Sequence, residues 1–178
     1  MKLLGISLIL TGIAYASLTL DEIFKDIPST ISTSDYVFVV DVHSQKNFLF
    51  YKNTLIDHFM VSTGSKHRYK GNREMREGVW RLSSRMNENL APIYGARLIY
   101  LEKYNKEKQK FVRTNRAFHG TNEPENIGQP TSMGCVYHFD QDIIDLYEYI
   151  PKDTLVITKK MIGDSFKGSN INVSLLPL

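Results

Sequence analysis

The chain has 178 residues, of which 42% are hydrophobic and 23% are charged, the usual proportions for a globular protein. That length allows one well-buried core and is too short for two. The formal net charge of +3 is too small to indicate nucleic acid as the main partner, and a single cysteine, Cys135, excludes a disulfide-rich scaffold.

Residues 1–16 have the pattern of a secretory signal peptide. Lys2 gives a positive start, residues 3–14 form a short apolar run, and residues 14–16 (AYA) give a small-x-small cleavage site. The run is too short for a membrane span, which needs about 20 apolar residues. An uncleaved anchor is the alternative interpretation. We therefore expect an exported protein of the periplasm or cell envelope, with no integral membrane span after cleavage.

The first part of the mature chain, residues 17–35, predicts a short helix and a linker. Residues 19–27 place apolar side chains at i, i+3, i+4 and i+7, and Pro28 ends that pattern. Three runs rich in β-branched and aromatic residues follow, separated by turn residues, and predict strands over residues 36–42, 46–51 and 55–63. Three linked strands this early in the chain indicate a sheet protein.

A basic loop over residues 65–76 separates these strands from the rest of the chain. It holds five Lys or Arg residues against one acid, which indicates a solvated surface or a surface for an acidic ligand. Further elements are expected as a strand over 78–82, a hairpin of 97–104 with 110–117, a helix over 140–149 that Asp140 caps, and a strand over 154–158. The predicted fold class is mostly β with one main helix, in a domain over residues 36–160 that precedes a tail over 161–178.

The stretch from Phe118 to Asp140 carries the candidate catalytic residues. His119 follows a predicted strand, and Cys135 stands 16 residues later, before the predicted helix. A thiol needs a base or a positive neighbour to become a nucleophilic thiolate at neutral pH, and the loop between the two residues can bring imidazole beside sulfur. Gly134 leaves the backbone uncrowded, so its amide and that of Cys135 are candidate donors to an oxyanion.

Other interpretations of these residues remain open. A lone cysteine in an exported protein is either an inert buried residue or one kept for its reactivity. His119, Cys135 and His138 would be three ligands of a zinc ion, although no fourth ligand stands at the usual spacing. His119 would alternatively be a structural histidine.

Five short motifs occur along the chain in a recognisable order. They are VVD at 39–41 with FLFY at 48–51, VSTG at 61–64, EGVW at 77–80, HGT at 119–121 and SMGCV at 132–136. In this order, and with a lone cysteine in a chain that has a signal peptide pattern, they resemble the L,D-transpeptidase (YkuD-type) catalytic domain over about residues 36–158.

The resemblance implies an L,D-transpeptidase-like β-sandwich and an enzyme that acts on peptidoglycan stem peptides without a metal or organic cofactor. Cys135 would be the nucleophile, His119 its general base, and Gly120 a support for the pair through its backbone carbonyl. Attack on the bond before D-alanine would release D-alanine and leave a thioester, which the amine of a neighbouring stem peptide resolves into a cross-link. Contacts with the substrate are implied for Ser132, Met133, Tyr137 and His138.

Two positions depart from the family pattern, which is Ser-His-Gly-Cys followed by a hydrophobic residue and then Arg or Asn. Met133 replaces the histidine and cannot donate a hydrogen bond or carry charge, and Tyr137 replaces the arginine. His138 is a candidate to compensate. The alternative functions are an L,D-carboxypeptidase or related amide hydrolase, in which water resolves the thioester, and a catalytically silent wall-binding domain.

Overall fold

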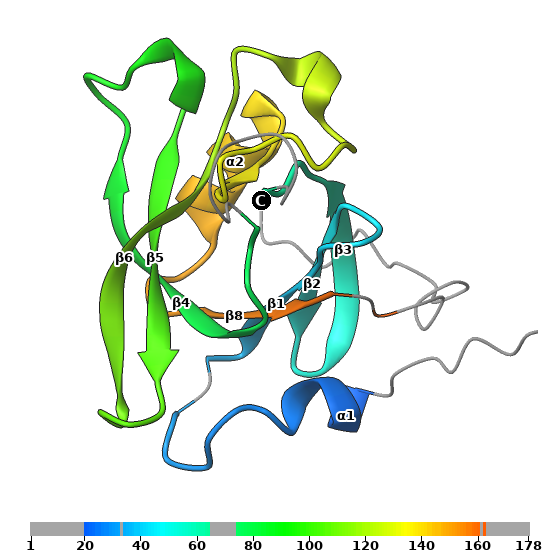
Figure 1. Ribbon diagram of the computed structural model, residues 1–178, viewed down its shortest axis with the longest axis vertical. Coiled ribbons are helices and arrows are strands. Elements are labelled where there is room, and N and C mark those ends of the chain that lie inside the picture. Colours follow the sequence, from blue (N-terminus) through cyan, green and yellow to red (C-terminus); the bar gives the residue numbers. More distant parts are fainter. Residues whose placement is uncertain (1–19, 33, 65–73, 161, 163–178) are drawn as a thin grey trace, which may run out of the picture.

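The structure, a computed structural model, describes residues 20–32, 34–64, 74–160 and 162 (Figure 1). The predicted signal peptide, most of the basic loop and nearly all of the predicted tail lie outside the described residues. No helix within the described ranges has the length and apolar character to cross a bilayer.

One mixed sheet of eight strands forms most of the described structure. Its strands are β1 (Tyr36–Asp41), β2 (Lys46–Tyr51), β3 (Thr54–Met60), β4 (Gly78–Met86), β5 (Leu98–Asn105), β6 (Lys110–His119), β7 (Val136–Tyr137) and β8 (Leu155–Lys159). The helices are α1 (Leu20–Phe24) and α2 (Asp140–Tyr149), with short 3-10 turns η1 (Pro92–Tyr94) and η2 (Pro124–Asn126). The spatial order is β3–β2–β1–β8–β4–β5–β6–β7, in which β1 with β8 and β6 with β7 are parallel and the other neighbours are antiparallel.

The sheet curls until its two edges meet. Register shifts interrupt the pairing of β2 with β3, of β4 with β5 and of β5 with β6, and irregularities of this kind bend strands. Beyond the end of β3, the backbone of Ser62 exchanges two hydrogen bonds with that of Tyr137 in β7, with N···O distances of 3.0 and 2.8 Å. A second bridge joins Gly64 to Ser132. The curled sheet is therefore closed beside β7.

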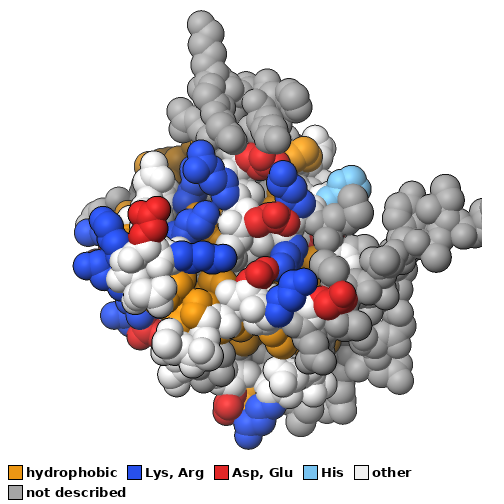
Figure 2. All heavy atoms as spheres, turned by 60° about the horizontal axis from the view of Figure 1, so that its bottom comes forward, with side chains coloured by type: hydrophobic (Ala, Val, Ile, Leu, Met, Phe, Trp, Pro, Cys, Tyr) orange, Lys and Arg blue, Asp and Glu red, His pale blue; other side chains and the backbone are white. Residues whose placement is uncertain are grey.

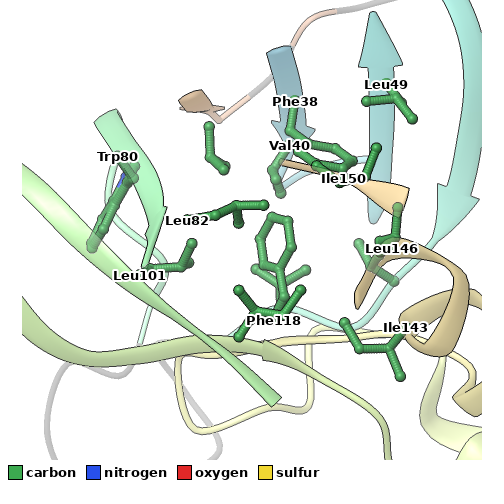
Figure 3. Close-up of a cluster of buried hydrophobic side chains, with 14 of the residues drawn as sticks. Phe38, Val40, Leu49, Trp80, Leu82, Leu101, Phe118, Ile143, Leu146 and Ile150 are labelled. Carbon is green, nitrogen blue, oxygen red and sulfur yellow. The ribbon is translucent and has the colours of Figure 1, made fainter. Parts of the chain in front are cut away.

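Both faces of the central strand β1 are buried. Phe38 and Val40 point into a core cluster inside the curl, where Phe118 of β6 and Leu146 of α2 join them (Figure 3). Val37, on the opposite face of β1, belongs to a second cluster that α1 helps to cover. Because the side chains of a strand alternate between faces, burial of both faces explains the nearly continuous apolar run of this strand.

The face of the molecule that carries α1 has a mixed surface charge. Figure 2 shows Lys and Arg side chains interspersed with Asp and Glu on the side that the view brings forward. Surface ion pairs include Lys159 with Asp26, and Arg81 with Glu102 at 2.7 Å. This distribution agrees with the small formal net charge of +3.

The predicted fold class is confirmed, because the described residues are mostly β with one main helix. α2 begins and ends at the predicted residues, but the predicted cap is wrong. Phe139 occupies the N-cap position without a side-chain hydrogen bond. The Asp140 carboxylate instead accepts hydrogen bonds from the backbone N–H groups of Ala96 and Thr121, which lie in two loops outside the helix.

Other boundaries differ from the prediction by a few residues. β4 continues to Met86, beyond the predicted end at residue 82, because its pairing with β5 resumes after the register shift. α1 ends at Phe24 and β3 at Met60, each three residues before the predicted end. The two-residue strand β7 has no counterpart in the prediction, since it is a strand only through its pairing with β6.

Candidate active site

β6 ends at His119, and Cys135 stands directly before β7, the neighbour of β6 in the sheet. The two strands run parallel, with His119 opposite Tyr137. Cys135 stands two residues before Tyr137, so it lies beside Ala117 in β6. Because alternate side chains of a strand share a face, residues 117 and 119 of β6 project to one side together with residue 137 of β7, and Cys135 lies in the turn just before β7. The fold thus brings the predicted nucleophile and the predicted base to neighbouring segments, the turn before β7 and the end of β6.

The hydrogen bond of His119 to its neighbour defines the tautomer of the ring. Nδ1 lies 2.6 Å from the carbonyl oxygen of Gly120. A carbonyl oxygen only accepts hydrogen bonds, so Nδ1 carries the proton and Nε2 keeps its lone pair. Burial lowers the pKa of His119 to about 4, although the hydrogen bond to Gly120 acts in the opposite direction. At neutral pH the imidazole is therefore uncharged and able to accept a proton at Nε2.

Two tyrosine rings hold the imidazole in place. The ring of Tyr94 in η1 meets it edge-on with a centroid distance of 5.1 Å, and the ring of Tyr137 lies 4.4 Å away. The side chain of His119 is 1% exposed. Packing from two sides restricts the ring to one orientation, as a general base requires.

Ser132 stabilises the turn that presents Cys135. Its Oγ donates to the carbonyl oxygen of Cys135 at 2.6 Å and accepts the N–H of Gly134 at 3.0 Å. Gly134 has a φ of +104°, which residues with a Cβ rarely adopt. Since its N–H is already bonded to Ser132, Gly134 is not the oxyanion donor that the sequence suggested. Its role is conformational.

Cys135 is partly exposed, and its Sγ lies 3.8 Å from the carbonyl oxygen of Asn115. Desolvation raises the pKa of the thiol, while a backbone hydrogen bond and the positive charge of Arg116 act to lower it. The thiol is thus protonated at neutral pH. Cys135 and His119 are therefore both uncharged at rest, and a thiol in this state must lose its proton when the sulfur reacts.

Arg116 belongs to this site but is not identified by the sequence analysis. It lies on β6 three residues before His119, and its Nη1 donates to the carbonyl oxygen of Met133 at 2.8 Å. This bond ties β6 to the turn before Cys135. The only signal in the sequence is a cation on the strand that ends at the predicted base, and such cations are common.

The VSTG motif supports the same turn from the other side. The carbonyl oxygen of Thr63 accepts the N–H of Ser132 at 3.0 Å, and Ser62 Oγ donates to the carbonyl oxygen of Gln129 at 2.6 Å. The amide of Gln45 holds Thr63 in turn, through hydrogen bonds of 2.7 Å to its N–H and 2.8 Å to its hydroxyl. The motif therefore contributes by holding the loop and not by contacting the thiol.

His138 lies in the core behind the site and is 0% exposed. Its Nδ1 donates to the carbonyl oxygen of Val136 at 3.2 Å, and its Nε2 accepts from the side-chain amide of Asn47 at 3.1 Å. Burial lowers its pKa to about 3. Because the protein occupies both ring nitrogens, we correct the two roles considered for His138, zinc ligand and substrate contact, to that of a structural histidine. Nowhere in the described ranges do three His, Cys, Asp or Glu side chains cluster as metal ligands.

The other three residues expected to contact a substrate differ in their exposure. Ser132 is 0% exposed and Tyr137 is 8% exposed, whereas Met133 is 38% exposed. Ser132 shapes the turn, and Tyr137 packs on His119. Met133 therefore presents the most accessible of the three side chains, and its contact with a substrate stays a prediction.

Comparison with known proteins places this geometry in a family. A family model described as the L,D-transpeptidase catalytic domain matches residues 35–158. The search of curated proteins found no match.

Solved structures share the fold at low sequence identity. Bd1075 of Bdellovibrio bacteriovorus has a TM-score of 0.60 and 22% identity, over 78% of this chain and 52% of its own. The L,D-transpeptidase of Xylanimonas cellulosilytica has a TM-score of 0.53 and 17% identity, over 74% of this chain and 64% of its own. The helical cell shape determining protein Pgp2 of Campylobacter jejuni has a TM-score of 0.55 and 14% identity, over 73% of this chain and 48% of its own. The chain thus spans between 48% and 64% of the length of these three structures.

These likenesses show the fold, and the family model covers most of the residues that build it. The chain belongs to the L,D-transpeptidase catalytic domain family.

Proposed function

We propose that this protein is an L,D-transpeptidase that cross-links peptidoglycan stem peptides through a thioester on Cys135. The observation that carries the proposal is the pairing of β6, which ends at His119, with β7, which directly follows Cys135, together with the hydrogen bond of His119 Nδ1 to Gly120. With the ring proton on Nδ1, the lone pair of Nε2 is available to accept a proton. Family membership and solved relatives named as L,D-transpeptidases support the same chemistry.

The proposed reaction begins with attack of Cys135 Sγ on the carbonyl carbon between the third stem residue and D-alanine. His119 Nε2 takes the thiol proton as the S–C bond forms. The oxyanion accepts a hydrogen bond from the N–H of Cys135, the remaining one of the two amides that the sequence suggested. The C–N bond then breaks, His119 returns the proton to the departing amine, and D-alanine leaves.

The second half of the reaction uses the same residues in reverse. An amine of a neighbouring stem attacks the thioester carbonyl carbon, and His119 takes a proton from that amine. The C–S bond breaks as the new amide forms, and His119 returns the proton to the sulfur of Cys135. Water in the place of the amine would give a trimmed stem peptide instead. Arg116 contributes a positive charge that favours the thiolate at each stage.

Purified peptidoglycan digested with the protein tests the proposal directly. We expect cross-linked muropeptides that have lost D-alanine, identified by mass, and none of them with a Cys135→Ser variant of normal fold. Trimmed, uncross-linked stems would assign the hydrolytic outcome. An unchanged product profile with Cys135→Ser would exclude the thiol as nucleophile.

We also propose that the protein is exported to the periplasm or cell envelope. The basis is the signal peptide pattern of residues 1–16 and a substrate located in the cell wall. Mass spectrometry of the protein from the envelope fraction should find an N-terminus at Ser17. A chain that begins at Met1 in that fraction would indicate an anchor instead.

A further inference from the structure

The peptide group between Gly120 and Thr121 connects His119 to an acid that the reaction scheme does not use. Its carbonyl oxygen accepts the Nδ1–H of His119 at 2.6 Å. The N–H of the same peptide group donates to Asp140 Oδ1 at 3.2 Å. The carboxylate, the peptide and the imidazole therefore form one continuous chain of hydrogen bonds, which ends at Nδ1 of the ring whose Nε2 is the proposed base.

The position of Asp140 Oδ1 depends on two glycines. A Cβ on Gly120 would stand 2.0 Å from this oxygen, and a Cβ on Gly95 would stand 2.2 Å from it. Gly95 also has a φ of +59°, and its successor Ala96 donates its N–H to the same oxygen at 3.1 Å. One carboxylate oxygen thus joins the loop after η1 to the loop after β6, at a place that only residues without side chains leave open.

The first residue of α2 supplies this carboxylate. α2 contacts both β5 and β6, the two strands whose neighbouring loops the carboxylate joins. The N-cap position is occupied by Phe139, whose side chain makes no capping hydrogen bond, so Asp140 is not the N-cap of its own helix. Its hydrogen bonds are made to the loops that hold His119.

We propose that Asp140 is a positioning residue, which acts on His119 through the Gly120–Thr121 peptide. By holding the N–H end of that peptide, the carboxylate keeps the carbonyl end directed at Nδ1. Its negative charge also polarises the peptide, since hydrogen bonds in a chain strengthen one another. Both effects favour the imidazolium that forms when Nε2 takes a proton from Cys135. The inference rests on the proposed function only in using Cys135 and His119 as a pair.

Other titratable groups around His119 do not supply this charge. Tyr94 from η1 and Tyr137 from β7 pack on its ring, and His138 lies behind it with its backbone N–H bonded to the carbonyl oxygen of His119 at 2.8 Å. Arg116 on β6 carries a positive charge that acts on Cys135. Of these groups and Asp140, only Asp140 is a carboxylate bonded to the peptide that accepts from His119.

The test measures the rate of alkylation of Cys135 by iodoacetamide as a function of pH, which requires no stem peptide. Asp140→Asn keeps an oxygen that can accept from both N–H groups but removes the charge. We expect the midpoint of the pH profile to move upward and the rate at neutral pH to fall about tenfold, the change that corresponds to about 1.4 kcal/mol. Asp140→Ala removes the oxygen that accepts both hydrogen bonds, so its alkylation rate should fall further. Asp142→Asn removes a charge from the same helix turn and should leave the profile unchanged.

Thermal denaturation of the same variants separates positioning from plain structural support. An Asp140→Asn variant that is less stable, yet has the alkylation profile of the wild type, would overturn the inference. If Asp140→Asn shifts the alkylation profile but the wild-type protein does not process stem peptides, the inference is supported and the proposed function is contradicted. If the wild-type protein cross-links stem peptides and neither Asp140 variant shifts the alkylation profile, the proposed function is supported and the inference is contradicted.

Discussion

Two histidines at the neighbouring ends of β6 and β7 differ in role although they share most local features. The side chain of His119 is 1% exposed and that of His138 is 0% exposed. Each ring donates Nδ1–H to a backbone carbonyl, of Gly120 and of Val136 respectively. Burial lowers the pKa of His119 to about 4 and that of His138 to about 3. Neither burial nor pKa therefore separates a candidate base from a structural histidine.

The difference lies at Nε2. In His138 this nitrogen accepts a hydrogen bond from Asn47, whereas none of the hydrogen bonds found among the described residues uses Nε2 of His119. A buried histidine is structural when the protein occupies both nitrogens, and it is a candidate base when the protein occupies one. The lesson is that the second nitrogen has to be traced before a role is assigned.

Replacing each histidine in turn gives the largest contrast. His119→Ala should lower the turnover of stem peptides by about 10²–10⁴-fold, because a positioned general base contributes that much. His138→Gln, which removes a ring that does not reach the substrate, should keep turnover within a few-fold of the wild type. The measurement is the rate of D-alanine release at neutral pH. Equal losses in the two variants would remove the distinction between them.

Gly120→Ala tests the support of the base without touching its ring. The new Cβ would stand 2.0 Å from Asp140 Oδ1 and 3.0 Å from the N atom of Ala96, so the peptide that holds Nδ1 must shift. We expect alkylation of Cys135 at neutral pH to slow by at least about tenfold, the change that about 1.4 kcal/mol produces.

The matched control for this variant is Gly128→Ala in the same loop. Its Cβ would meet only the end of the Met60 side chain, at 3.3 Å, although its φ of +91° makes the substitution strained as well. Strain alone should therefore lower stability without changing the alkylation rate. A wild-type rate in Gly120→Ala would show that the carbonyl of Gly120 does not govern the base.

The two histidines also predict how stability depends on pH. Both pKa values lie below the ordinary value of 6.5, so unfolded histidines bind protons before folded ones do. Their contribution to stability is complete above about pH 6.5 and is lost as the pH falls toward 4 and then 3. Urea titrations should show the free energy of unfolding decreasing over this window.

His138→Gln should make that decrease shallower, because one of the two groups is gone. His58→Gln is the control, since His58 is exposed on β3. The same pH slope in His138→Gln as in the wild type would mean that His138 is not buried in the uncharged form.

The smallest expected effect is that of Arg116. Arg116→Gln removes the charge that lowers the pKa of the Cys135 thiol and the donor to the carbonyl of Met133. Because partly exposed charges are screened, we expect alkylation at neutral pH to slow by only about threefold, with a smaller difference at high salt. Arg113→Gln, on the same strand, should have no effect. A difference that persists unchanged in high salt would assign the effect to the hydrogen bond and not to the charge.

The sequence was sufficient for the features that depend on local pattern. The strands β1, β2 and β6 and the limits of α2 are predicted because runs of β-branched and aromatic residues, and apolar residues at helical spacing, reflect burial of a strand or helix. The candidate pair His119 and Cys135 followed from residue type and from motif order. The first kind of signal lies within single elements, and the second lies in short motifs whose order along residues 39–136 can be read without the fold.

Features that depend on contacts between distant segments were not predictable in this way. Gly95 and Asp140 meet across 45 positions, and Ser62 pairs with Tyr137 across 75. The role of His138 was misassigned because its partner Asn47 lies in β2, far away in the sequence. Arg116 was missed because its partner is a backbone carbonyl, which carries no residue-specific signal.

Intact mass of the protein mixed with a stem tetrapeptide tests the roles of Cys135 and His119 in one experiment. We expect a transient adduct on Cys135 with the mass of the tetrapeptide less D-alanine, formed by the wild type and by His138→Gln. Cys135→Ser should form none, and His119→Ala should form it very slowly. An adduct on another residue, or an adduct that forms at the wild-type rate in His119→Ala and not in His138→Gln, would contradict the assignment of Cys135 as nucleophile and His119 as its base.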